Sequence, residues 1–346
     1  MGSSAHSALV FKVNKLGDNI VFLPVIQRLA EERIFDRLTL WNTPLAVPLY
    51  QPLRPHVRLE ITTREAFYPA WKNPAKLLAL TRKVRSARPD IALVAEDMGN
   101  TAYFLALASG APRRLGIRPP YLKIPFAINE AVSLEREAPS AVKSWNLGRA
   151  LAAAAGAPAW PMNPPPPDLS HLIRDSAVPF DVLFHAGAST DYQRWPIERH
   201  ADLAGRLSQN LRVGWFDIPA LPQPVLDSRV KVIRSQELDV LVSHIARAGV
   251  FVGNNSGPMN IASALGTPSV ILMGPTSRPW DPYWHPSRFR ILRDEKLPCI
   301  CCDPPGLPIR QFCTNRVHPM ACMDHWRVET VEEEVLSWHR QWAPPS

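Results

Sequence analysis

The ten-residue run Phe251–Asn260, FVGNNSGPMN, constrains the fold of this chain more than any other segment. Its apolar start predicts a buried strand. The polar residues that follow predict a sharp turn into a short helix, because Asn255 or Ser256 can cap a helix and proline fits its first turn. Gly266 ends that helix, and a second apolar run at 269–273 begins another strand. A strand, helix and strand in this order predict a parallel α/β sheet.

The turn of this run is also suited to binding an anion. The first N–H groups of a helix have no partners within it, and the N-terminus carries a partial positive charge. Open α/β sheets bind ligands at the carboxyl ends of their strands, which is where such a turn lies. An ordinary strand-to-helix turn has the same pattern, so the residues alone leave a phosphate site and a plain turn open.

Length and composition predict two α/β domains. The chain has 346 residues, too many for one ordinary domain, and 46% of them are hydrophobic. Apolar and amphipathic segments alternate in both halves, which predicts doubly wound parallel sheets. Four prolines at 164–167 predict a stiff connector, so we expect domains at 1–160 and 161–330. Strands are expected at 8–14, 38–41, 57–61, 90–95, 180–184 and 270–273, and helices at 19–33, with Pro24 near its first turn, 74–88, 101–109 and 331–341.

The charge of the chain is uneven. Residues 1–160 carry 21 Lys and Arg against 12 Asp and Glu, whereas residues 161–346 carry 18 against 19. A basic first domain suits an anionic acceptor, such as a glycan, glycolipid or protein, or an anionic membrane surface. A solubilising surface would give the same excess. The sequence has no dense cluster of basic and aromatic residues, which argues against nucleic acid as a partner. Neither an apolar run of about 20 residues nor a signal segment is present, which favours a cytoplasmic protein, with peripheral contact to the inner membrane surface left open.

Two further turns carry candidate site residues. Lys15-Leu-Gly17-Asp18 follows the first strand, where Gly17 permits a tight turn and close ligand approach. Asp18 is either a helix cap or a general base, and Lys15 is either a phosphate ligand or a solvated side chain. In the second half, His185 to Pro196 follows a strand and offers the hydroxyls of Ser189 and Thr190 and the forked guanidinium of Arg194. A surface ion pair is the alternative role for this arginine.

All five cysteines lie between 299 and 322. The spacing Cys299-x2-Cys302-x10-Cys313-x8-Cys322 leaves Cys301 spare and forms two arms of a tetrahedral site for zinc or iron. The proline-rich loop between the arms has few apolar residues, so a metal would supply its order. Reduced thiols without a metal are the alternative.

Taken together, these segments resemble glycosyltransferase family 9, the ADP-heptose:lipopolysaccharide heptosyltransferases and their relatives. Residues 253–260 resemble the family's Gly-Asn-Asp-Ser-Gly-Pro-Met-His, with Asn255 in place of the Asp and Asn260 in place of the His. The Leu-Gly-Asp turn at 16–18 and the Leu-Pro at 23–24 match the family's first loop. Residues 185–196 resemble its His-x-Gly-Ala … Lys-Arg-Trp-Pro stretch, with Gln193 replacing the Lys.

The resemblance implies the GT-B fold, two Rossmann-like domains facing a cleft, with a C-terminal helix in 331–346 that packs back on the first domain. It implies an inverting transferase that moves a sugar, heptose by family, from an ADP-linked donor to an acceptor hydroxyl in lipopolysaccharide or another surface glycan. Asp18 would be the general base. No catalytic cofactor is implied, and the late cysteine cluster is similar to one that holds iron in some members. The implied donor-binding residues are Lys15, Gly17, Ser189, Thr190, Arg194, Asn255, Ser256, Gly257 and Asn260.

Two alternatives stay open at this point. The substituted Asn255 and Asn260 leave room for another donor and for a protein or natural-product acceptor. A catalytically silent GT-B scaffold, whose cysteine segment mediates assembly, would keep the same fold.

Overall fold

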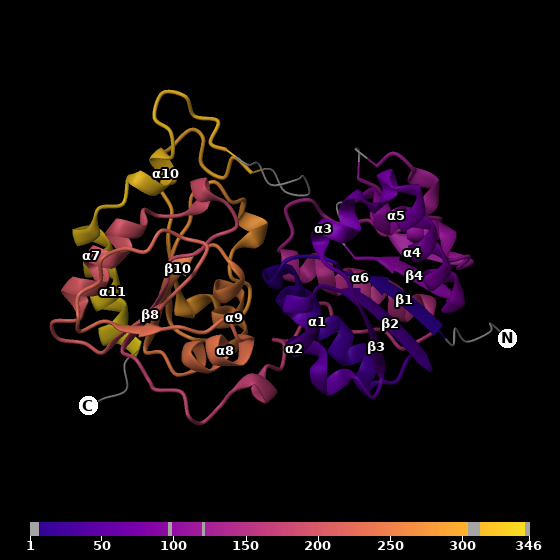
Figure 1. The fold of residues 1–346 in the computed structure, drawn as a ribbon, viewed down its shortest axis with the longest axis horizontal. Coiled ribbons are helices and arrows are strands. Elements are labelled where there is room, and N and C mark those ends of the chain that lie inside the picture. The colour runs from indigo at the N-terminus through magenta and orange to yellow at the C-terminus, as the bar shows by residue number, and fades with distance from the viewer. Residues whose placement is uncertain (1–6, 96–98, 120–121, 304–311, 343–346) are drawn as a thin grey trace. The chain divides into compact units, whose positions relative to one another are not determined.

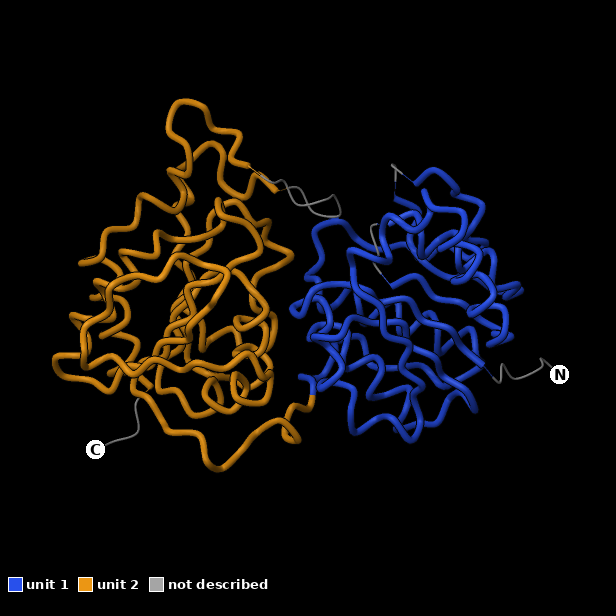
Figure 2. Tube along the Cα trace, viewed as in Figure 1, with its two compact units in different colours: residues 1–167 blue, residues 168–346 orange. Residues whose placement is uncertain are grey.

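A computed structural model describes residues 7–95, 99–119, 122–303 and 312–342 of the chain. The chain divides into two units, residues 1–167 and residues 168–346 (Figures 1 and 2). Each unit has its own parallel six-stranded sheet with helices on both faces. The expectation of two doubly wound α/β domains is therefore confirmed.

The sheet of unit 1 has the strand order β3-β2-β1-β4-β5-β6. All of its neighbouring strands are parallel. The strands are β1 (Ser7–Phe11), β2 (Arg37–Asn42), β3 (Val57–Ile61), β4 (Ile91–Val94), β5 (Arg113–Gly116) and β6 (Glu130–Ala131). The helices are α1 (Leu16–Glu31), α2 (Val47–Tyr50), α3 (Arg64–Phe67), α4 (Pro74–Ser86), α5 (Asn100–Ala108) and α6 (Ser140–Ala154).

Unit 2 repeats this arrangement with the strand order β12-β11-β10-β7-β8-β9. Counted from its own first strand, this is the same order as in unit 1. The strands are β7 (Val182–His185), β8 (Val213–Phe216), β9 (Lys231–Ile233), β10 (Val250–Asn254), β11 (Ser269–Leu272) and β12 (Phe289–Leu292). The helices are α7 (Ile197–Leu207), α8 (Leu238–Ala246), α9 (Gly257–Leu265), α10 (Ala321–Asp324) and α11 (Val328–Trp342).

The strand order places a topological switch point in each sheet, between β1 and β4 in unit 1 and between β7 and β10 in unit 2. At such a point the connections on the two sides run in opposite directions, which leaves a crevice at the carboxyl ends of the central strands. These central strands are mostly apolar and almost entirely buried, as expected for a parallel sheet covered by helices.

The first part of the connector, near the boundary expected after residue 160, packs against unit 1. The centre of the Trp160 ring lies 4.7 Å from that of the Trp145 ring of α6, and the Trp160 indole N–H donates to Glu32 over 2.9 Å. The Trp145 indole in turn donates to the carbonyl of Pro161 over 2.7 Å. These contacts tie the first part of the connector to α1 and α6, so unit 1 extends to Pro167, the last proline of the run.

The C-terminal helix contributes to the core of unit 2. Helix α11 packs on α7 and on the sheet strands β10 and β11 of unit 2, and its expected packing on the first domain stays a prediction. Its apolar stripe of Val328, Val331 and Val335 is buried in the core of unit 2. The heptad-like spacing of these valines gives one apolar face, and the unit 2 sheet covers it.

Local predictions were accurate for most strands and less so for helix ends. Helix α1 begins at Leu16 rather than Asn19, so Pro24 lies in the helix interior and not near its first turn. The sequence did not predict helix α6, which packs on α1. The two helices approach closely at Gly148, because a side chain there would clash with Val25 of α1. Among the helices that the structure describes, none is both long and apolar enough to cross a bilayer.

Candidate functional site

The turn between β10 and α9 has the geometry that its sequence predicts. Ser256 is the N-cap of α9 with an extended backbone, and proline occupies the first turn. Gly266 ends the helix in the left-handed conformation, with φ of 67°. The Ser256 hydroxyl donates to the carbonyl of Asn254 over 3.2 Å rather than accepting from the helix. The first N–H groups of α9, including that of Gly257, therefore remain directed out of the carboxyl edge of the sheet.

Asn254 connects this turn, through hydrogen bonds, to the loop that follows β7 on the other side of the switch point. The side chain is fully buried, its amide group donates to the carbonyl of Ala186 over 2.9 Å, and its oxygen accepts from the Trp195 N–H over 3.0 Å. Both ends of the β7 loop are thus held by one residue of the signature run. A buried amide that uses both of its ends in this way fixes a backbone geometry, because leaving either end unpaired is costly.

The two asparagines that depart from the family pattern are also engaged in unit 2. The Asn255 amide donates to the carbonyl of Trp280 over 3.1 Å. The Asn260 amide, which is buried, donates back to the carbonyl of Ser256 over 3.3 Å. Both side chains brace the turn, and neither adds an ionisable group to it.

The loop after β7 carries the predicted Ser189, Thr190 and Arg194. The Ser189 side chain is exposed and that of Thr190 is half-buried. Arg194 pairs with Asp191, an exposed carboxylate three residues earlier. The surface ion pair considered for this arginine is therefore present, and an exposed pair of this kind contributes little to stability.

His185 shapes the start of the same loop. The Gly187 N–H donates to its Nδ1 over 3.3 Å, and burial lowers its pKa to about 4. The ring is therefore neutral near pH 7, and its proton lies on Nε2. A Cβ on Gly187 would lie 2.7 Å from this ring, so only glycine lets the backbone pass here.

A buried carboxylate ties the β7 loop to the cysteine segment. Asp303 is 5% exposed and accepts hydrogen bonds from the Tyr192 hydroxyl, at 2.7 and 2.8 Å, and from the Gln193 amide, at 3.3 Å. The same amide donates to the Thr276 hydroxyl over 3.2 Å. Gln193 stands where the family has Lys, and its side-chain amide forms hydrogen bonds with other residues of unit 2. It links the loops that follow β7 and β11 to the residue after Cys302.

In unit 1 the candidate base lies inside a helix. Asp18 is the third residue of α1, Lys15 is its N-cap, and Gly17 is helical rather than in a turn. Asp18 is therefore not the N-cap of this helix. Gly17 does not form the tight turn that the sequence predicts. The Asp18 side chain is half-buried, and no hydrogen bond to it comes from the residues that the structure describes.

A network that the sequence did not reveal holds this first turn of α1. The Asn19 amide donates to the carbonyls of Asn14 and Lys15, at 3.2 and 2.9 Å. Its oxygen accepts from the Asn42 amide at 2.8 Å and from the Tyr50 hydroxyl at 3.1 Å. Asn19 is fully buried, so the residue next to Asp18 has a fixed orientation. An asparagine inside an apolar helical stretch was the only signal in the sequence.

The carboxyl edge of unit 1 is electropositive. Burial and the cation of Arg64 lower the pKa of the Lys15 ammonium, and the Asp18 carboxylate opposes that shift. Arg64, at the start of α3, was not predicted as a site residue. The fully buried Lys12 donates to the carbonyl of Ala95 over 3.2 Å, across the switch point between β1 and β4. Lys15 and Arg64, near the Asp18 carboxylate, suit an anionic acceptor.

Three cysteines of this segment lie near Cys322, but the described residues do not form a metal site. Burial is the main cause that raises the pKa of the Cys322 thiol to about 12. The nearby thiols of Cys302, Cys313 and Cys299 also raise this pKa, in decreasing order. The Asn315 amide donates to Cys299 over 3.4 Å, and the Met320 N–H donates to Cys313 over 3.3 Å. Among the described residues, however, no three cysteine, histidine or acidic side chains converge at the geometry of a metal site. The segment from residue 312 to α10 projects beyond the body of unit 2 (Figure 1).

The structure thus sorts the predicted residues into two groups at two sheet edges. Unit 2 brings the signature turn and the β7 loop together, with Asn254 between them. Unit 1 holds Lys15, Gly17 and Asp18 in a single turn of α1.

Two Rossmann-like units with ligand-suited turns at their switch points define the GT-B class of glycosyltransferases. Glycosyltransferase family 9 (heptosyltransferase) matches residues 77–301, and the chain belongs to this family. A comparison with curated protein sequences finds no match.

Solved heptosyltransferases share the fold at low sequence identity. The E. coli ADP-heptose lps heptosyltransferase II is 20% identical with a TM-score of 0.65, and the match covers 97% of this chain and 99% of that one. E. coli WaaC with ADP-2-deoxy-2-fluoro heptose is 15% identical with a TM-score of 0.66, covering 95% and 99%. The iron-containing dodecameric glycosyltransferase TibC of enterotoxigenic E. coli is 15% identical with a TM-score of 0.62, covering 99% and 78%.

Proposed function

We propose that this protein is an inverting glycosyltransferase that moves heptose from ADP-heptose to an acceptor hydroxyl during the synthesis of lipopolysaccharide or another surface glycan. The observation that carries the proposal is the junction in unit 2, where Asn254 holds the α9 turn and the β7 loop together at a switch point. A backbone fixed in this way presents free N–H groups to a phosphate.

The donor occupies unit 2 in this proposal. The N-terminus of α9, with Ser256 and Gly257, faces the diphosphate, and the hydroxyls of Ser189 and Thr190 donate to its oxygens. Asn255 and Asn260 brace the turn with neutral amides. The choice of ADP and heptose is supported by the structural relatives, since WaaC was solved with ADP and with an ADP-heptose analogue.

Arg194 stabilises the leaving group. Its present partner is an exposed carboxylate, and a diphosphate offers a stronger forked contact. The guanidinium exchanges Asp191 for the phosphate oxygens when the donor binds. Because charge builds on the diphosphate as the glycosidic bond breaks, this contact strengthens in the transition state.

Unit 1 holds the acceptor, and Asp18 acts as the general base. The carboxylate takes the proton of the acceptor hydroxyl as that oxygen attacks the anomeric carbon, and the bond from this carbon to the diphosphate breaks. Attack opposite the leaving group inverts the configuration. Lys15 binds an acceptor phosphate or carboxylate, or a donor phosphate, and the positive charge of unit 1 favours an anionic glycan, glycolipid or protein acceptor at the cytoplasmic face of the inner membrane.

The cysteine segment holds a structural zinc or iron ion in this proposal. The four thiols suit such an ion by their chemistry, and N–H groups already point at two of the sulfurs. Cys299, Cys302, Cys313 and Cys322 would be the ligands. An ion bound by all four thiolates would order the segment and would take no part in transfer. No catalytic cofactor enters the reaction.

Transfer from a defined donor tests the proposal. The full-length protein is incubated with ADP-heptose and, separately, with UDP-glucose or GDP-mannose, in the presence of bacterial glycan extract as acceptor, and the released nucleoside diphosphate is measured. We expect extract-dependent release of ADP alone. Release of UDP or GDP would assign another donor, and no release from any of the three would contradict a transferase function.

A further inference from the structure

Two segments of unit 1 are basic and contain no acidic residue. Residues 66–89 hold six Lys and Arg and no Asp or Glu, and residues 98–129 hold four Lys and Arg and no Asp or Glu. These segments contain α4, α5 and the short turns η3 (Tyr68–Lys72) and η4 (Pro125–Ala127). Charge of a single sign over neighbouring elements attracts a partner of the opposite sign.

The four elements form one layer on one face of the unit 1 sheet. Phe11 of β1 and Val94 of β4 are partners in the parallel register, so their side chains point to the same side of the sheet. Val84 of α4, Leu105 of α5 and Ala127 of η4 belong to the buried cluster that contains both. The turn η3 packs on α4 and α5. The exposed side chains of these elements therefore lie on the outer surface of one layer, away from the sheet.

The outer surface of this layer has an apolar centre. Helix α5 lies in the middle, because it packs on α4, η3 and η4. It has no charged residue, and its Phe104 and Leu107 are only partly buried. Around it, Leu78 of α4 is 51% exposed, Phe126 of η4 is 64% exposed, and Trp71 of η3 is half-buried. Single exposed apolar residues are common, but a group of them on neighbouring elements indicates a contact surface.

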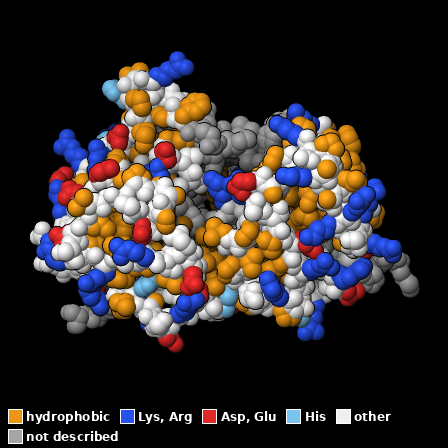
Figure 3. Space-filling view, viewed as in Figure 1, with side chains coloured by type: hydrophobic (Ala, Val, Ile, Leu, Met, Phe, Trp, Pro, Cys, Tyr) orange, Lys and Arg blue, Asp and Glu red, His pale blue; other side chains and the backbone are white. Residues whose placement is uncertain are grey.

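Basic side chains border this apolar centre. The ammonium groups of Lys72 and Lys123 lie 5.6 and 4.9 Å from the centre of the Trp71 ring. Arg82 is exposed and follows Leu78 by one helical turn, so the two share a side of α4. In the part of the chain that the structure describes, no carboxylate pairs with Lys72, Arg82 or Lys123. Lys and Arg side chains also dominate the charged surface on the visible face of unit 1 (Figure 3).

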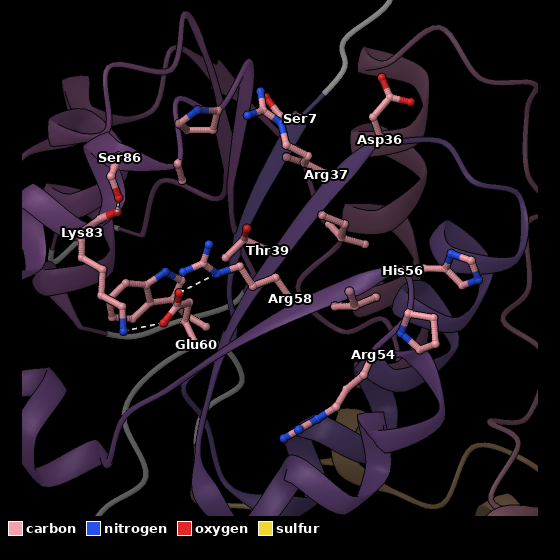
Figure 4. A pocket seen from close by; sticks show the side chains of 17 residues that line it. Ser7, Asp36, Arg37, Thr39, Arg54, His56, Arg58, Glu60, Lys83 and Ser86 are labelled. Carbon is pink, nitrogen blue, oxygen red and sulfur yellow. Dashed lines mark hydrogen bonds and ion pairs between the residues drawn. The ribbon is translucent and has the colours of Figure 1, made fainter.

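Other cations of α4 are used within the unit. Lys83 pairs with Glu60 of β3 (Figure 4). The Arg85 guanidinium donates to the carbonyl of Ala108, at the end of α5, over 2.9 Å. These two contacts fasten α4 to the sheet and to α5, so the layer is a fixed surface, whereas the cations that border the apolar centre are available to a partner.

We propose that the outer surface of this layer binds peripherally to a membrane that contains anionic phospholipids. The apolar side chains and the tryptophan enter the headgroup region, and the bordering Lys and Arg contact lipid phosphates. A second copy of the chain fits less well, because a symmetric contact through this surface would place like charges against each other. Nucleic acid would match the charge but would leave the apolar centre without a partner. The surface does not depend on the proposed transferase activity.

Co-sedimentation of the full chain with vesicles tests the proposal. Phosphatidylcholine vesicles are compared with vesicles that also contain phosphatidylglycerol, and no glycan is present. Arg82→Gln/Lys123→Gln should lower the affinity for the anionic vesicles by about tenfold or more, because each cation near such a surface contributes about fivefold. Leu78→Gln/Phe126→Gln should lower it by about tenfold as well, because two apolar side chains no longer enter the interface.

Matched controls remove the same kinds of side chain elsewhere. Arg54→Gln/Lys231→Gln removes two exposed cations, and Val178→Gln/Val225→Gln removes two exposed apolar side chains of unit 2. Both controls should bind the anionic vesicles like the wild type. All four variants change exposed side chains, so each should keep the unfolding midpoint of the wild type.

Phosphatidylglycerol-dependent binding that falls in both surface variants and in neither control supports the proposal. The proposal is overturned if the wild type does not bind the anionic vesicles, if either surface variant binds like the wild type, or if a control loses as much as the surface variants. Self-association of the protein without vesicles, abolished by Leu78→Gln/Phe126→Gln, would also overturn it, because it would assign the surface to a second copy of the chain.

Discussion

The hydroxyl of Tyr192 donates to the carboxylate of Asp303, with 2.7 and 2.8 Å to its two oxygens. This contact joins the loop of the predicted donor residues to the segment that follows the first cysteine pair. Burial and the neighbouring carboxylate both raise the pKa of Tyr192, so the phenol stays protonated and donates. The backbone N–H of Asp303 also donates to the carbonyl of Pro275 over 2.8 Å, which anchors the segment on a third loop.

Tyr192→Phe is expected to lower the stability of unit 2 and to weaken ADP binding. The change leaves a buried carboxylate with one hydrogen bond fewer, which costs roughly 1.5–3 kcal/mol. Chemical unfolding and ADP titration of Tyr192→Phe, Asp303→Asn and the double variant measure the pair. We expect the double variant to lose less than the sum of the single losses, and strictly additive losses would show that the contact is not coupled.

Asp18→Asn is expected to reduce transfer by about 10²-fold or more while ADP affinity stays unchanged, because a general base is lost without a change in shape. The control is Asp36→Asn, which removes an exposed carboxylate of the same unit. Transfer is measured as release of nucleoside diphosphate with saturating donor and acceptor. Near wild-type turnover in Asp18→Asn would remove this residue from the mechanism.

The stability of unit 2 should fall as the pH drops below about 6.5. His200 is fully buried beside Trp195, and burial lowers its pKa to about 3. The unfolded chain therefore binds a proton that the folded protein excludes, so stability is full above pH 6.5 and is lost as the pH falls toward 3. His185, with a pKa lowered to about 4, acts in the same direction.

Unfolding midpoints in urea between pH 7.5 and 4.5 measure this dependence. His200→Leu removes the titrating group and should flatten the decline, although its stability at pH 7.5 will differ. His56→Gln, which changes an exposed histidine of unit 1, should leave the slope unchanged. An unaltered slope in His200→Leu would assign the decline to other groups.

Purified protein is expected to carry about one zinc or iron ion per chain. Four thiols lie in one segment, and three of them are near enough to Cys322 to raise its pKa. Cys302→Ser should release the ion and destabilise residues 299–322, whereas Cys301→Ser, the spare thiol, should not. Elemental analysis of protein purified without a chelator or a nickel column measures the content. Metal-free protein of full stability would refute the site.

The sequence predicted the sheets because parallel strands buried on both faces are almost continuously apolar, as in 8–11 and 250–252. The signature turn was equally readable, since Ser256, Pro258 and Gly266 each have a local preference that agrees with the structure. Local agreement of this kind needs no tertiary information.

Tertiary contacts decided what the sequence could not give. Asn254 and Asn19 are polar residues in apolar surroundings, and only the fold shows which carbonyls they meet. Asp303 and Gln193 are 110 positions apart, so no spacing rule predicts their contact. The amphipathic stripe of the C-terminal helix predicts a buried face, but not that β10, β11 and α7 cover it.

The central claim is that unit 2 binds an adenosine-linked nucleotide sugar through the signature turn and Arg194. Calorimetric titration with ADP, UDP and GDP tests it most directly, using the wild type, Arg194→Ala and the control Arg229→Ala, which breaks another local Arg–Asp pair of unit 2. We expect ADP to bind most tightly and Arg194→Ala alone to weaken it by about 1.5–3 kcal/mol. Tighter binding of UDP or GDP, or equal ADP affinity in all three proteins, would contradict the account.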